Sequence, residues 1–448
     1  MIKLRLLVAV WITKILTFFG RLMGRNASST PGKIALKICP NLIRVLSGSV
    51  KSGIIAVCGT NGKTTTNNLL YSALTQSGYR VICNTLGANM LSGIAVVFAQ
   101  SCNIFGKLTA DYACLEIDEA YATALFDHIT PSHMLITNLF RDQLDRYGEI
   151  DITAGLLKNA INKAGNIQLI LNGDDPLTAQ FGLARNNTRY FGVTEQVLPQ
   201  VRETRESRFC VLCGAEMQYS YYHYSQLGDF RCPQCGYSRP HIDFAACGVD
   251  MSDSLNFTVN SDTVRLKYRG FYNIYNTLAV YAVLSVLGVP TAHLMNALAQ
   301  HKPQVGRMEE FAFRKPVIFN LSKNPAGFNQ AIMTLQNDIR KKDVIVAIND
   351  NPADGTDISW LWDVDFDKLG CGNLHSLTVT GTRLYDIALR FKYANVAVDY
   401  ITTDIRQSVI NSLNSDSKIC YILVNYTALF STHDLLSELL RKGGELYE

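Results

Sequence analysis

Residues 53–66 read GIIAVCGTNGKTTT, and this stretch decides the fold. Its opening apolar residues predict a buried strand, and residues 67–76, which follow it, predict a helix. Between the two lies a Gly-x-x-Gly-Lys-Thr loop at 59–64; the longer G-x-x-x-x-G-K-[ST] spacing is not met, because Val57 stands where its first glycine belongs. In such a loop backbone N–H groups and the lysine face phosphates, and the threonine hydroxyl reaches Mg²⁺. The sequence therefore predicts a nucleotide-binding α/β domain.

Length and composition limit the classes of protein that fit. The chain has 448 residues, of which 48% are hydrophobic and 18% charged, so it is an ordinary globular protein with length for about three domains. Its 42 basic and 38 acidic residues give a net charge of +4, too near balance to favour nucleic acid as the main partner. We therefore expect no nucleic-acid binding.

Further segments, in order along the chain, resemble the Mur ligases, the ATP-dependent amide-bond-forming enzymes of cell-wall synthesis related to folylpolyglutamate synthase. The segments that carry the resemblance are GTNGKTTT at 59–66, LEIDE at 115–119, TNLFRDQLD at 137–145, LNGDDP at 171–176, YFG at 190–192, GFYNIYN at 270–276 and GRME at 306–309. The resemblance implies an α/β fold in which a P-loop central domain with a parallel-rich sheet precedes a smaller α/β C-terminal domain. We expect an N-terminal helix and linker at 1–48, the central domain at 49–305 and the C-terminal domain at 306–448.

The resemblance also implies the cofactors and the residues that hold them. The cofactors are ATP and Mg²⁺, with Lys63 and Glu116 as catalytic residues and Thr64 and Glu116 as the magnesium ligands. Gln143 and Tyr272 stand where the family has histidines, and Gln143 leaves a second metal site open. The residues expected to bind the nucleotide are Gly59, Thr60, Asn61, Gly62, Lys63, Thr64, Thr65, Asn138, Asn273, Asn276 and Arg307.

Four of the twelve cysteines form two CxxC pairs separated by 18 residues, the spacing of a zinc ribbon. Four thiolates make a closed tetrahedral site with no open position, so we predict a structural Zn²⁺ rather than a catalytic dithiol or a pair of disulfides. The predicted ligands are Cys210, Cys213, Cys232 and Cys235.

The ribbon, at about 205–240, interrupts the ligase-like region between Gly192 and Gly270. Standard Mur ligases lack it, so it is an insertion. The other eight cysteines occur singly, mostly beside apolar residues, and we expect them to be buried free thiols of a reducing compartment.

An aspartate-rich loop at 350–357 follows the first predicted strand of the C-terminal part, which is where an α/β sheet presents functional side chains. A calcium loop fails, because Pro352 and Leu361 occupy positions that need oxygen ligands. A solvated acidic turn is the alternative. The predicted strands are 343–349, 376–381, 396–401 and 420–425.

The core, the ribbon, this loop and YTAL at 426–429 together resemble one branch of the family, the MurT subunits of lipid II isoglutaminyl synthase, over essentially the whole chain. That branch amidates the α-carboxylate of D-glutamate in the lipid II stem peptide, with ammonia from a GatD-type glutaminase subunit. The resemblance implies that an aspartate of the loop completes the partner's Cys-His site. We favour Asp354 over Asp350, because Gly355 beside it frees the backbone, and Asp357 stays open.

Elementary chemistry supports this scheme. A carboxylate does not react with ammonia at neutral pH, so ATP must first convert it to an acyl phosphate. No Gly-x-Cys-x-Gly elbow surrounds any cysteine, which indicates that the glutaminase is supplied by a partner. The alternatives are a stand-alone ligase that adds an amino acid and, in another class, a nucleotide switch or nucleic-acid-binding protein.

The first 24 residues are mainly apolar, but the longest uncharged run, 6–13, is too short to span a bilayer, which takes about 20 residues. Helical spacing puts Lys3, Lys14 and Arg21 along one edge of a wide apolar face. The segment fits a helix at a bilayer surface or one docked on protein, and no signal-peptide cleavage site follows it. We expect a cytoplasmic protein at the inner face of the plasma membrane, with peripheral membrane contact.

Overall fold

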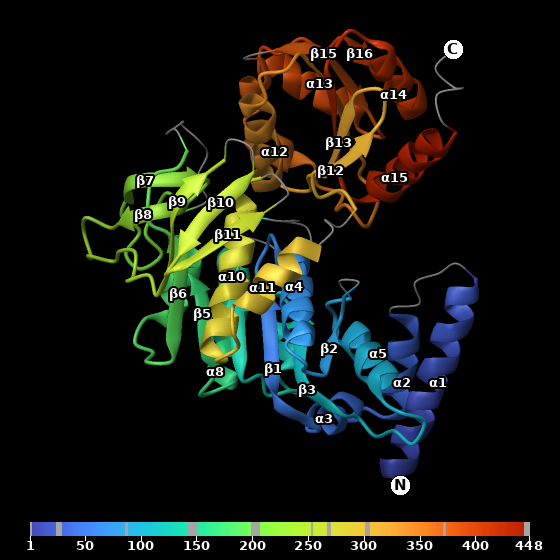
Figure 1. Ribbon diagram of the computed structural model, residues 1–448, viewed down its shortest axis with the longest axis vertical. Coiled ribbons are helices and arrows are strands. Elements are labelled where there is room, and N and C mark those ends of the chain that lie inside the picture. The colour runs from blue at the N-terminus through green and yellow to red at the C-terminus, as the bar shows by residue number, and fades with distance from the viewer. Residues whose placement is uncertain are drawn as a thin grey trace.

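The computed structural model describes residues 2–23, 29–85, 88–141, 150–198, 207–251, 254–266, 270–300, 305–370 and 373–442. Two α/β units, each built on its own sheet, lie one above the other (Figure 1). The lower sheet has nine strands and the upper sheet has six. The expected α/β fold is confirmed.

The larger sheet has the order β11-β10-β9-β6-β5-β4-β1-β3-β2, with parallel pairing from β2 to β9 and antiparallel pairing beyond. Both faces of β1 are buried from Ile54 to Cys58, which is why this part of the strand is a continuous apolar run rather than an alternating one. The strands are β1 Val50–Cys58, β2 Val81–Cys83, β3 Ala110–Glu116, β4 His133–Ile136, β5 Gln168–Asn172, β6 Thr188–Val193, β9 Phe244–Asp250, β10 Leu255–Val259 and β11 Asp262–Leu266.

Helices cover both faces of this sheet. One core holds Val57 of β1 with α4 and α10, and the other holds Ala56 with α3, α5 and α8. The first face carries α4 Lys63–Gln76, α10 Tyr272–Val286 and α11 Ala292–Gln300; the second carries α3 Leu42–Ser47, α5 Leu91–Ser101, α6 Ala122–Leu125 and α8 Ile150–Lys163.

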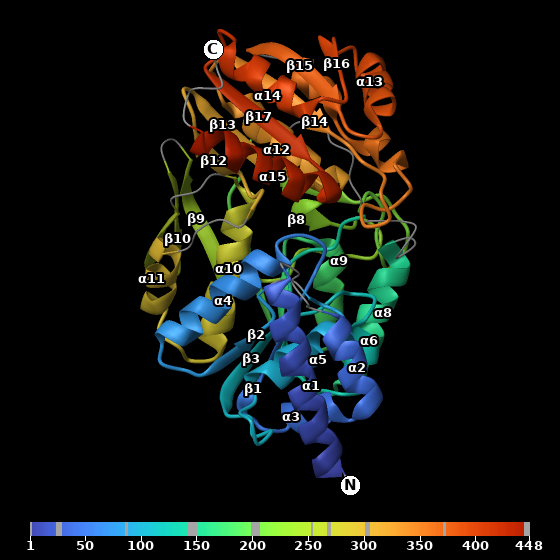
Figure 2. The ribbon, with the colours of Figure 1, turned by 90° about the vertical axis from the view of Figure 1, so that its right-hand side faces the viewer.

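At the N-terminus, α1 Ile2–Leu22 and α2 Thr30–Ile38 pack beside α5 (Figure 2). Gly32 of α2 lies so close to α5 that a Cβ atom there would be 1.8 Å from the carbonyl oxygen of Ser92. The expectation of one helix followed by a linker is therefore corrected, because Pro31 takes the first turn of α2, where its fixed φ and missing N–H suit a helix start. Residues 24–28 lie outside the described residues.

The smaller sheet has the order β12-β13-β17-β14-β15-β16, and only β12 is antiparallel. Its strands are β12 Glu309–Ala312, β13 Pro316–Leu321, β14 Lys342–Ala347, β15 Leu374–Thr380, β16 Tyr400–Ile401 and β17 Ile419–Val424. One face carries α12 Pro325–Asn337 and α13 Leu384–Tyr393, and the other carries α14 Ile405–Asn414 and α15 Tyr426–Arg441.

Most predicted strands are confirmed within a few residues, but the one at 396–401 is largely wrong. Only Tyr400–Ile401 pairs with β15, at the edge of the sheet. Val396 instead donates its N–H to the carbonyl of Phe391 and closes the end of α13, with Asn395 at φ 55°. A helix ending thus occupies residues whose apolar pattern predicted a strand.

The expected burial of the single cysteines needs correction at two positions. Cys247, on β9, is exposed, whereas Cys39, Cys58, Cys102, Cys114 and Cys420 are buried as expected and Cys83 is partly buried. Cys371 lies outside the described residues. None of the described helices combines the length and the apolarity needed to cross a bilayer.

Candidate functional site

The glycine loop joins the carboxyl end of β1 to the first turn of α4. Gly59 and Gly62 have φ of 121° and 83°, the left-handed region that favours glycine. A Cβ atom on Gly62 would lie 2.1 Å from Oδ1 of Asn276, and one on Gly59 would lie 2.2 Å from Oγ1 of Thr137. The loop needs glycine at both positions for conformation and for space, and α4 directs its N-terminus toward whatever the loop holds.

The Thr137-Asn138 segment, which follows β4, holds the glycine loop by hydrogen bonds. The Asn61 N–H donates to Oδ1 of Asn138 at 2.9 Å, and Nδ2 of Asn138 donates back to the Asn61 carbonyl at 3.1 Å. Thr137 donates to the same carbonyl at 2.8 Å, and Thr60 exchanges hydrogen bonds with the backbone of Phe140. These contacts fix Thr60 and Asn61 without using the outward-facing side of the loop.

Lys63 is paired with Glu119. Its Nζ lies 2.8 Å from Oε1 of Glu119, which also accepts the Gly59 N–H at 2.8 Å. Burial opposes the charged ammonium, but the carboxylates of Glu119 and Glu116 outweigh it and raise the pKa of Lys63. Burial raises the pKa of the Glu119 carboxyl, and Lys63 opposes that rise. The lysine is therefore held protonated beside the loop by this carboxylate.

Glu116 fits a divalent cation. It ends β3, next to Val57 in the register of the sheet, and is 3% exposed. Its Oε1 accepts from Asn89 at 3.3 Å, whereas its buried Oε2 has no hydrogen-bond partner within the described residues. A buried carboxylate oxygen without a partner is costly unless an ion uses it, and hard oxygen ligands suit Mg²⁺. Thr64 lies in the first turn of α4, where the family pattern places the second ligand.

A cleft lies above the glycine loop, between the two α/β units. It is lined from below by Asn61, Gly62, Thr65, Asn138, Tyr272 and Asn276, and from the smaller unit by Arg307, Asn320, Leu321, Lys323, Asn324, Gly327 and Gln330. Six residues predicted to bind nucleotide thus converge, because Asn61, Gly62, Thr65, Asn138, Asn276 and Arg307 share one cleft. Asn273 lies beneath it and accepts from Nδ2 of Asn276 at 3.3 Å.

Helix α12 presents its N-terminus to the same cleft. The Asn324 side chain caps this helix by accepting the Gly327 N–H at 2.8 Å, and its Nδ2 donates to Oδ1 of Asn61 at 3.2 Å across the two units. Gln330, one turn further, is buried with its Nε2 unpartnered among the described residues. Sequence reasoning missed these residues, although Asn324-Pro325 is a helix-start signal that could have located the first.

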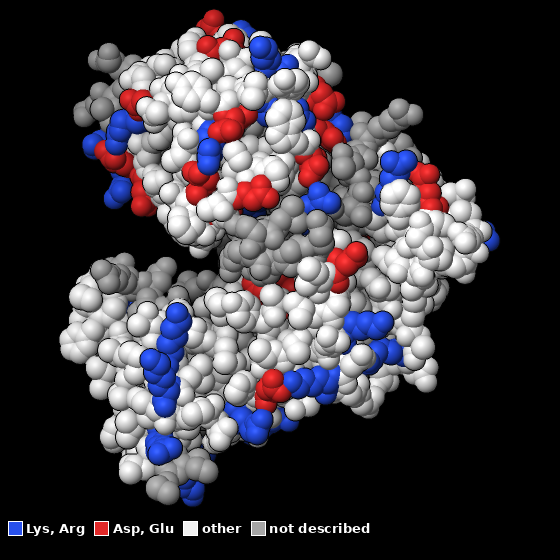
Figure 3. Space-filling model, turned by 180° about the vertical axis from the view of Figure 1, so that it is seen from behind, with Lys and Arg blue, Asp and Glu red and all other residues white. Residues whose placement is uncertain are grey.

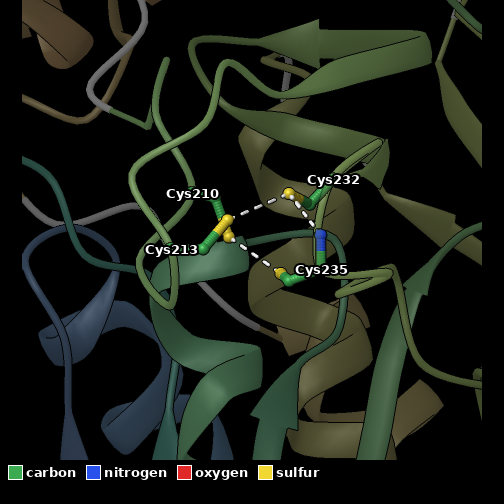
Figure 4. A group of neighbouring side chains, drawn as sticks. All are labelled: Cys210, Cys213, Cys232 and Cys235. Carbon is green, nitrogen blue, oxygen red and sulfur yellow. Dashed lines mark hydrogen bonds between the residues drawn. The ribbon is translucent and has the colours of Figure 1, made fainter.

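The four predicted zinc ligands form one cluster (Figure 4). Sγ of Cys210 lies 3.6 Å from that of Cys235, Sγ of Cys213 lies 3.5 Å from that of Cys232, and all four sulfurs lie within 4.8 Å of one another. Tetrahedral zinc with Zn–S bonds of about 2.3 Å places its sulfurs about 3.8 Å apart, so the cluster fits a Zn²⁺ ion. The sulfurs are too far apart for disulfides, whose bond is about 2.05 Å.

The ribbon packs against the larger α/β unit. Its hairpin, β7 Gln218–Tyr224 and β8 Leu227–Arg231, ends in a buried turn where Nε2 of Gln226 donates to the Leu139 carbonyl at 2.7 Å. Tyr224, beside that turn, packs on Phe140 and Phe271 and lines the cleft. The hairpin therefore supplies part of the cleft wall, which the sequence did not predict.

The loop aspartates are held differently from one another. Asp350 accepts from Thr382 at 2.8 Å and pairs with Arg383 at 2.7 Å, and these contacts, the Thr382 hydrogen bond first, lower the pKa of its carboxyl. Asp354 accepts the Thr427 N–H at 2.8 Å and the Thr427 hydroxyl, at the N-terminus of α15. Asp357 accepts the Ser359 N–H. All three aspartates follow β14. Gln143, which stands where the family has a histidine, lies outside the described residues.

Known proteins resemble this chain over nearly its whole length. Residues 57–231 match the family described as Mur ligase middle domain, and residues 321–429 match the family described as MurT ligase C-terminal. The chain is 35% identical over 424 residues to the lipid II isoglutaminyl synthase (glutamine-hydrolyzing) subunit MurT of Staphylococcus aureus (strain COL), covering 94% of this chain and 95% of the relative. The Streptococcus pneumoniae (strain ATCC BAA-255 / R6) protein of the same name is 33% identical over 429 residues, with the same coverage.

Solved structures share the fold. A pseudomurein peptide ligase type C from Methanothermus fervidus superposes with a TM-score of 0.67 at 22% identity, over 92% of this chain and 85% of that one. The MurF ligase from Thermotoga maritima in complex with ADP gives 0.63 at 15% identity, over 92% and 85%.

Proposed function

The chain belongs to the MurT subunits of lipid II isoglutaminyl synthase, within the Mur ligase family, and from this premise we propose that it amidates the α-carboxylate of D-glutamate in the lipid II stem peptide to D-isoglutamine. It is a ligase of the type that joins carbon to nitrogen. The observation that carries the proposal is a glycine loop and a MurT-type C-terminal unit facing each other across one cleft.

ATP activates the substrate carboxylate in this proposal. A carboxylate oxygen attacks the γ-phosphorus, ADP leaves, and an acyl phosphate forms; ammonia then attacks the acyl carbon, phosphate leaves, and the nitrogen loses a proton. Lys63 and the backbone N–H groups of residues 62–65 hold the phosphates, with Lys63 moving from Glu119 to the terminal ones. Glu116 and Thr64 would hold Mg²⁺, which supplies positive charge to the transferring phosphoryl group.

The rest of the nucleotide lies in the cleft. Asn276, fixed by Asn273 and in contact range of Gly62, is proposed to meet the adenine side. Arg307 is proposed to approach the phosphates from the smaller unit. Lys323 lines the same cleft beside Asn324, so the smaller unit brings a second cation to it.

The ammonia comes from a separate GatD-type glutaminase subunit in this proposal. The relatives are named as subunits of a glutamine-hydrolyzing enzyme, and this chain has no nucleophile elbow around a cysteine. The strand order helps explain the transfer: β13 leads to Asn324 in the cleft, β14 leads to Asp354, and only β17 separates them. Adjacent strands lie about 4.8 Å apart, so the ends of β13 and β14 lie about 10 Å apart along one sheet edge.

Asp354 is the proposed contribution to the partner's site. Its carboxylate is oriented by the Thr427 N–H and hydroxyl, whereas that of Asp350 is neutralised by Arg383. The Thr427 donors are neutral, and the Asp354 carboxylate would fix the tautomer of a partner's histidine. Asp350 and Asp357 are the alternatives.

The four-cysteine ribbon is proposed to bind a structural Zn²⁺. The reaction is proposed to take place in the cytoplasm, at the inner face of the plasma membrane, where lipid II is anchored. The division of the chain into 1–48, 49–305 and 306–448 is retained as a proposal.

The test is amidation of lipid II with ATP and Mg²⁺, using either ammonium or glutamine, with and without the partner subunit. We expect ammonium to support amidation by the chain alone and glutamine to support it only with the partner. Glutamine-dependent amidation by the chain alone would contradict the two-subunit proposal.

Asp354→Asn keeps an oxygen to accept the Thr427 N–H but removes the charge. We expect it to lower glutamine-dependent amidation at least about a hundredfold and to spare the ammonium-dependent reaction, because only the partner's histidine loses its carboxylate. Asp350→Asn and Asp357→Asn serve as matched controls. Equal loss of both reactions in Asp354→Asn would assign this residue to the fold.

A further inference from the structure

We propose that the outer face of α1 and the neighbouring turn at 103–106 dock this chain on an anionic phospholipid bilayer. This lipid-facing surface consists of two groups of exposed apolar side chains. The first group is on α1, Leu4, Trp11, Ile15, Phe18, Phe19 and Leu22, and the second is the pair Ile104 and Phe105.

The two faces of α1 have different roles. Ala9, Thr13 and Thr17 are buried where the helix packs on α2 and α5. At about 100° per residue, the six exposed apolar side chains fall within an arc of about 100° on the opposite face. The exposed apolar face of α1 is therefore not the face by which the helix packs on its own protein. The two expectations for this segment, contact with protein and contact with a bilayer surface, thus apply to opposite faces of the helix.

The turn at 103–106 extends the apolar surface beyond the helix. Nε1 of Trp11 donates to the Ile104 carbonyl at 2.7 Å, which ties the turn to α1. Phe105 is 79% exposed, an unusual degree for a phenylalanine that contributes nothing to the core. Two separate chain segments thus present large apolar side chains side by side to solvent.

The charge around this surface has one sign. Residues 1–110 contain twelve Lys and Arg and no Asp or Glu, whereas the other 30 basic residues and all 38 acidic residues lie in 111–448. The region of α1 and α2, at the lower left of Figure 3, accordingly shows basic and no acidic side chains on this face. On α1, Lys3 and Arg21 border the apolar stripe on one side and Arg5 on the other, so their long side chains can reach headgroups while the stripe enters the interface.

An anionic bilayer is the occupant that this combination fits. An apolar stripe within a long block that has basic residues and no acidic one complements a surface of uniform negative charge. None of the described helices is long and apolar enough to cross a bilayer, and a helix with basic residues beside a wide apolar face binds in the plane of the interface. The inference rests on these residues and not on the amidation reaction.

The experiment measures vesicle binding by the full chain without ATP or lipid II. Vesicles of phosphatidylcholine with phosphatidylglycerol are compared with vesicles of phosphatidylcholine alone, and Trp11 emission and co-flotation are recorded. We expect binding to the anionic vesicles to be at least about tenfold tighter and to weaken as salt is raised.

The double substitution Phe18→Ser with Phe105→Ser should weaken binding to anionic vesicles at least about tenfold. Ile339→Ser, at a residue that is 85% exposed on the smaller unit, is the matched control and should bind as the original chain does. Retained ADP binding in both variants shows that they fold. Equal binding to the two kinds of vesicle, an unchanged double variant, or a double variant that instead loses self-association would overturn the proposal. Vesicle binding without amidation activity would overturn the proposed function alone.

Discussion

At the scale of single residues, the site is centred on Lys63, whose positive charge is balanced by the carboxylate of Glu119. Glu119 neutralises the lysine and accepts the Gly59 N–H, so one carboxylate engages two groups of the glycine loop. The motif identified Lys63 and Glu116 from the sequence. It did not identify Glu119, because LEIDE offers two glutamates and only the fold shows which one reaches the lysine.

Glu116→Gln tests the magnesium assignment. We expect the Mg²⁺ concentration for half-maximal ATP-dependent activity to rise at least about tenfold, because an amide is a poor substitute for a carboxylate ligand. Binding of ADP without metal should be unchanged, and thermal stability should not fall, since the substitution removes a buried charge with no described partner at Oε2. Asp111→Asn, at the partly buried start of β3 and away from the glycine loop, is the control. An unaltered Mg²⁺ dependence would contradict the assignment.

Asp175 gives a pH dependence. Burial raises the pKa of its carboxyl to about 7, against the opposing hydrogen bonds from the N–H groups of Leu139 and Leu177. The unfolded value is about 3.9, so the native state binds this proton more tightly and the carboxyl's contribution to the free energy of unfolding falls as pH rises from about 4 to about 7. Asp175→Asn removes that titration. We expect the variant to lose less stability than the original chain between pH 5 and 8 in parallel denaturant titrations, and parallel losses would refute the assignment.

At the scale of elements, two helix N-termini and one hairpin converge on the cleft. Helix α4 arrives through the glycine loop, α12 through the Asn324 cap, and β7–β8 through Tyr224. The first was predictable, because strand, glycine loop and helix are contiguous in the sequence. The hairpin's part was not, because the spacing of the cysteines predicts a zinc ribbon but says nothing of what its turn packs against.

Removal of zinc should therefore weaken nucleotide binding. Cys232→Ser breaks the cluster that holds the base of the β7–β8 hairpin, and Tyr224 at the other end forms part of the cleft wall. We expect the zinc content to fall and the Kd for a fluorescent ADP analogue to rise about tenfold, which corresponds to about 1.4 kcal/mol. Cys247→Ser, an exposed cysteine outside the cluster, is the control. A zinc-free protein with unchanged ADP affinity would show that the ribbon does not support the cleft.

At the scale of the whole molecule, the two α/β units meet over the nucleotide cleft. Asn324 bonds to Asn61, and Arg141 pairs with Asp363 at 3.2 Å, each across the two units. The sequence predicted both units, together with β1 and three strands of the smaller sheet, since those follow from local apolar patterns. It did not predict the residues the smaller unit brings to the cleft, such as Gln330, because an isolated glutamine in a helix carries no local signal.

Asn324→Asp separates the two roles of that residue. An aspartate still caps α12 by accepting the Gly327 N–H, but it cannot donate to Asn61 and it places negative charge beside the phosphate-binding loop. We expect ADP affinity to fall about tenfold or more with little change in thermal stability. Asn324→Ser, which also caps but adds no charge, should show a smaller loss of affinity. Equal affinity in all three proteins would mean that the cleft does not close on the nucleotide.

The central claim is that this chain is an amidating ligase. Its most direct test is mass spectrometry of lipid II after incubation with the purified chain, ATP, Mg²⁺ and ammonium. We expect the D-glutamate residue to gain an α-amide with release of ADP and phosphate, and Lys63→Ala to abolish both. A product carrying an additional amino acid, or amidation that proceeds without ATP, would contradict it.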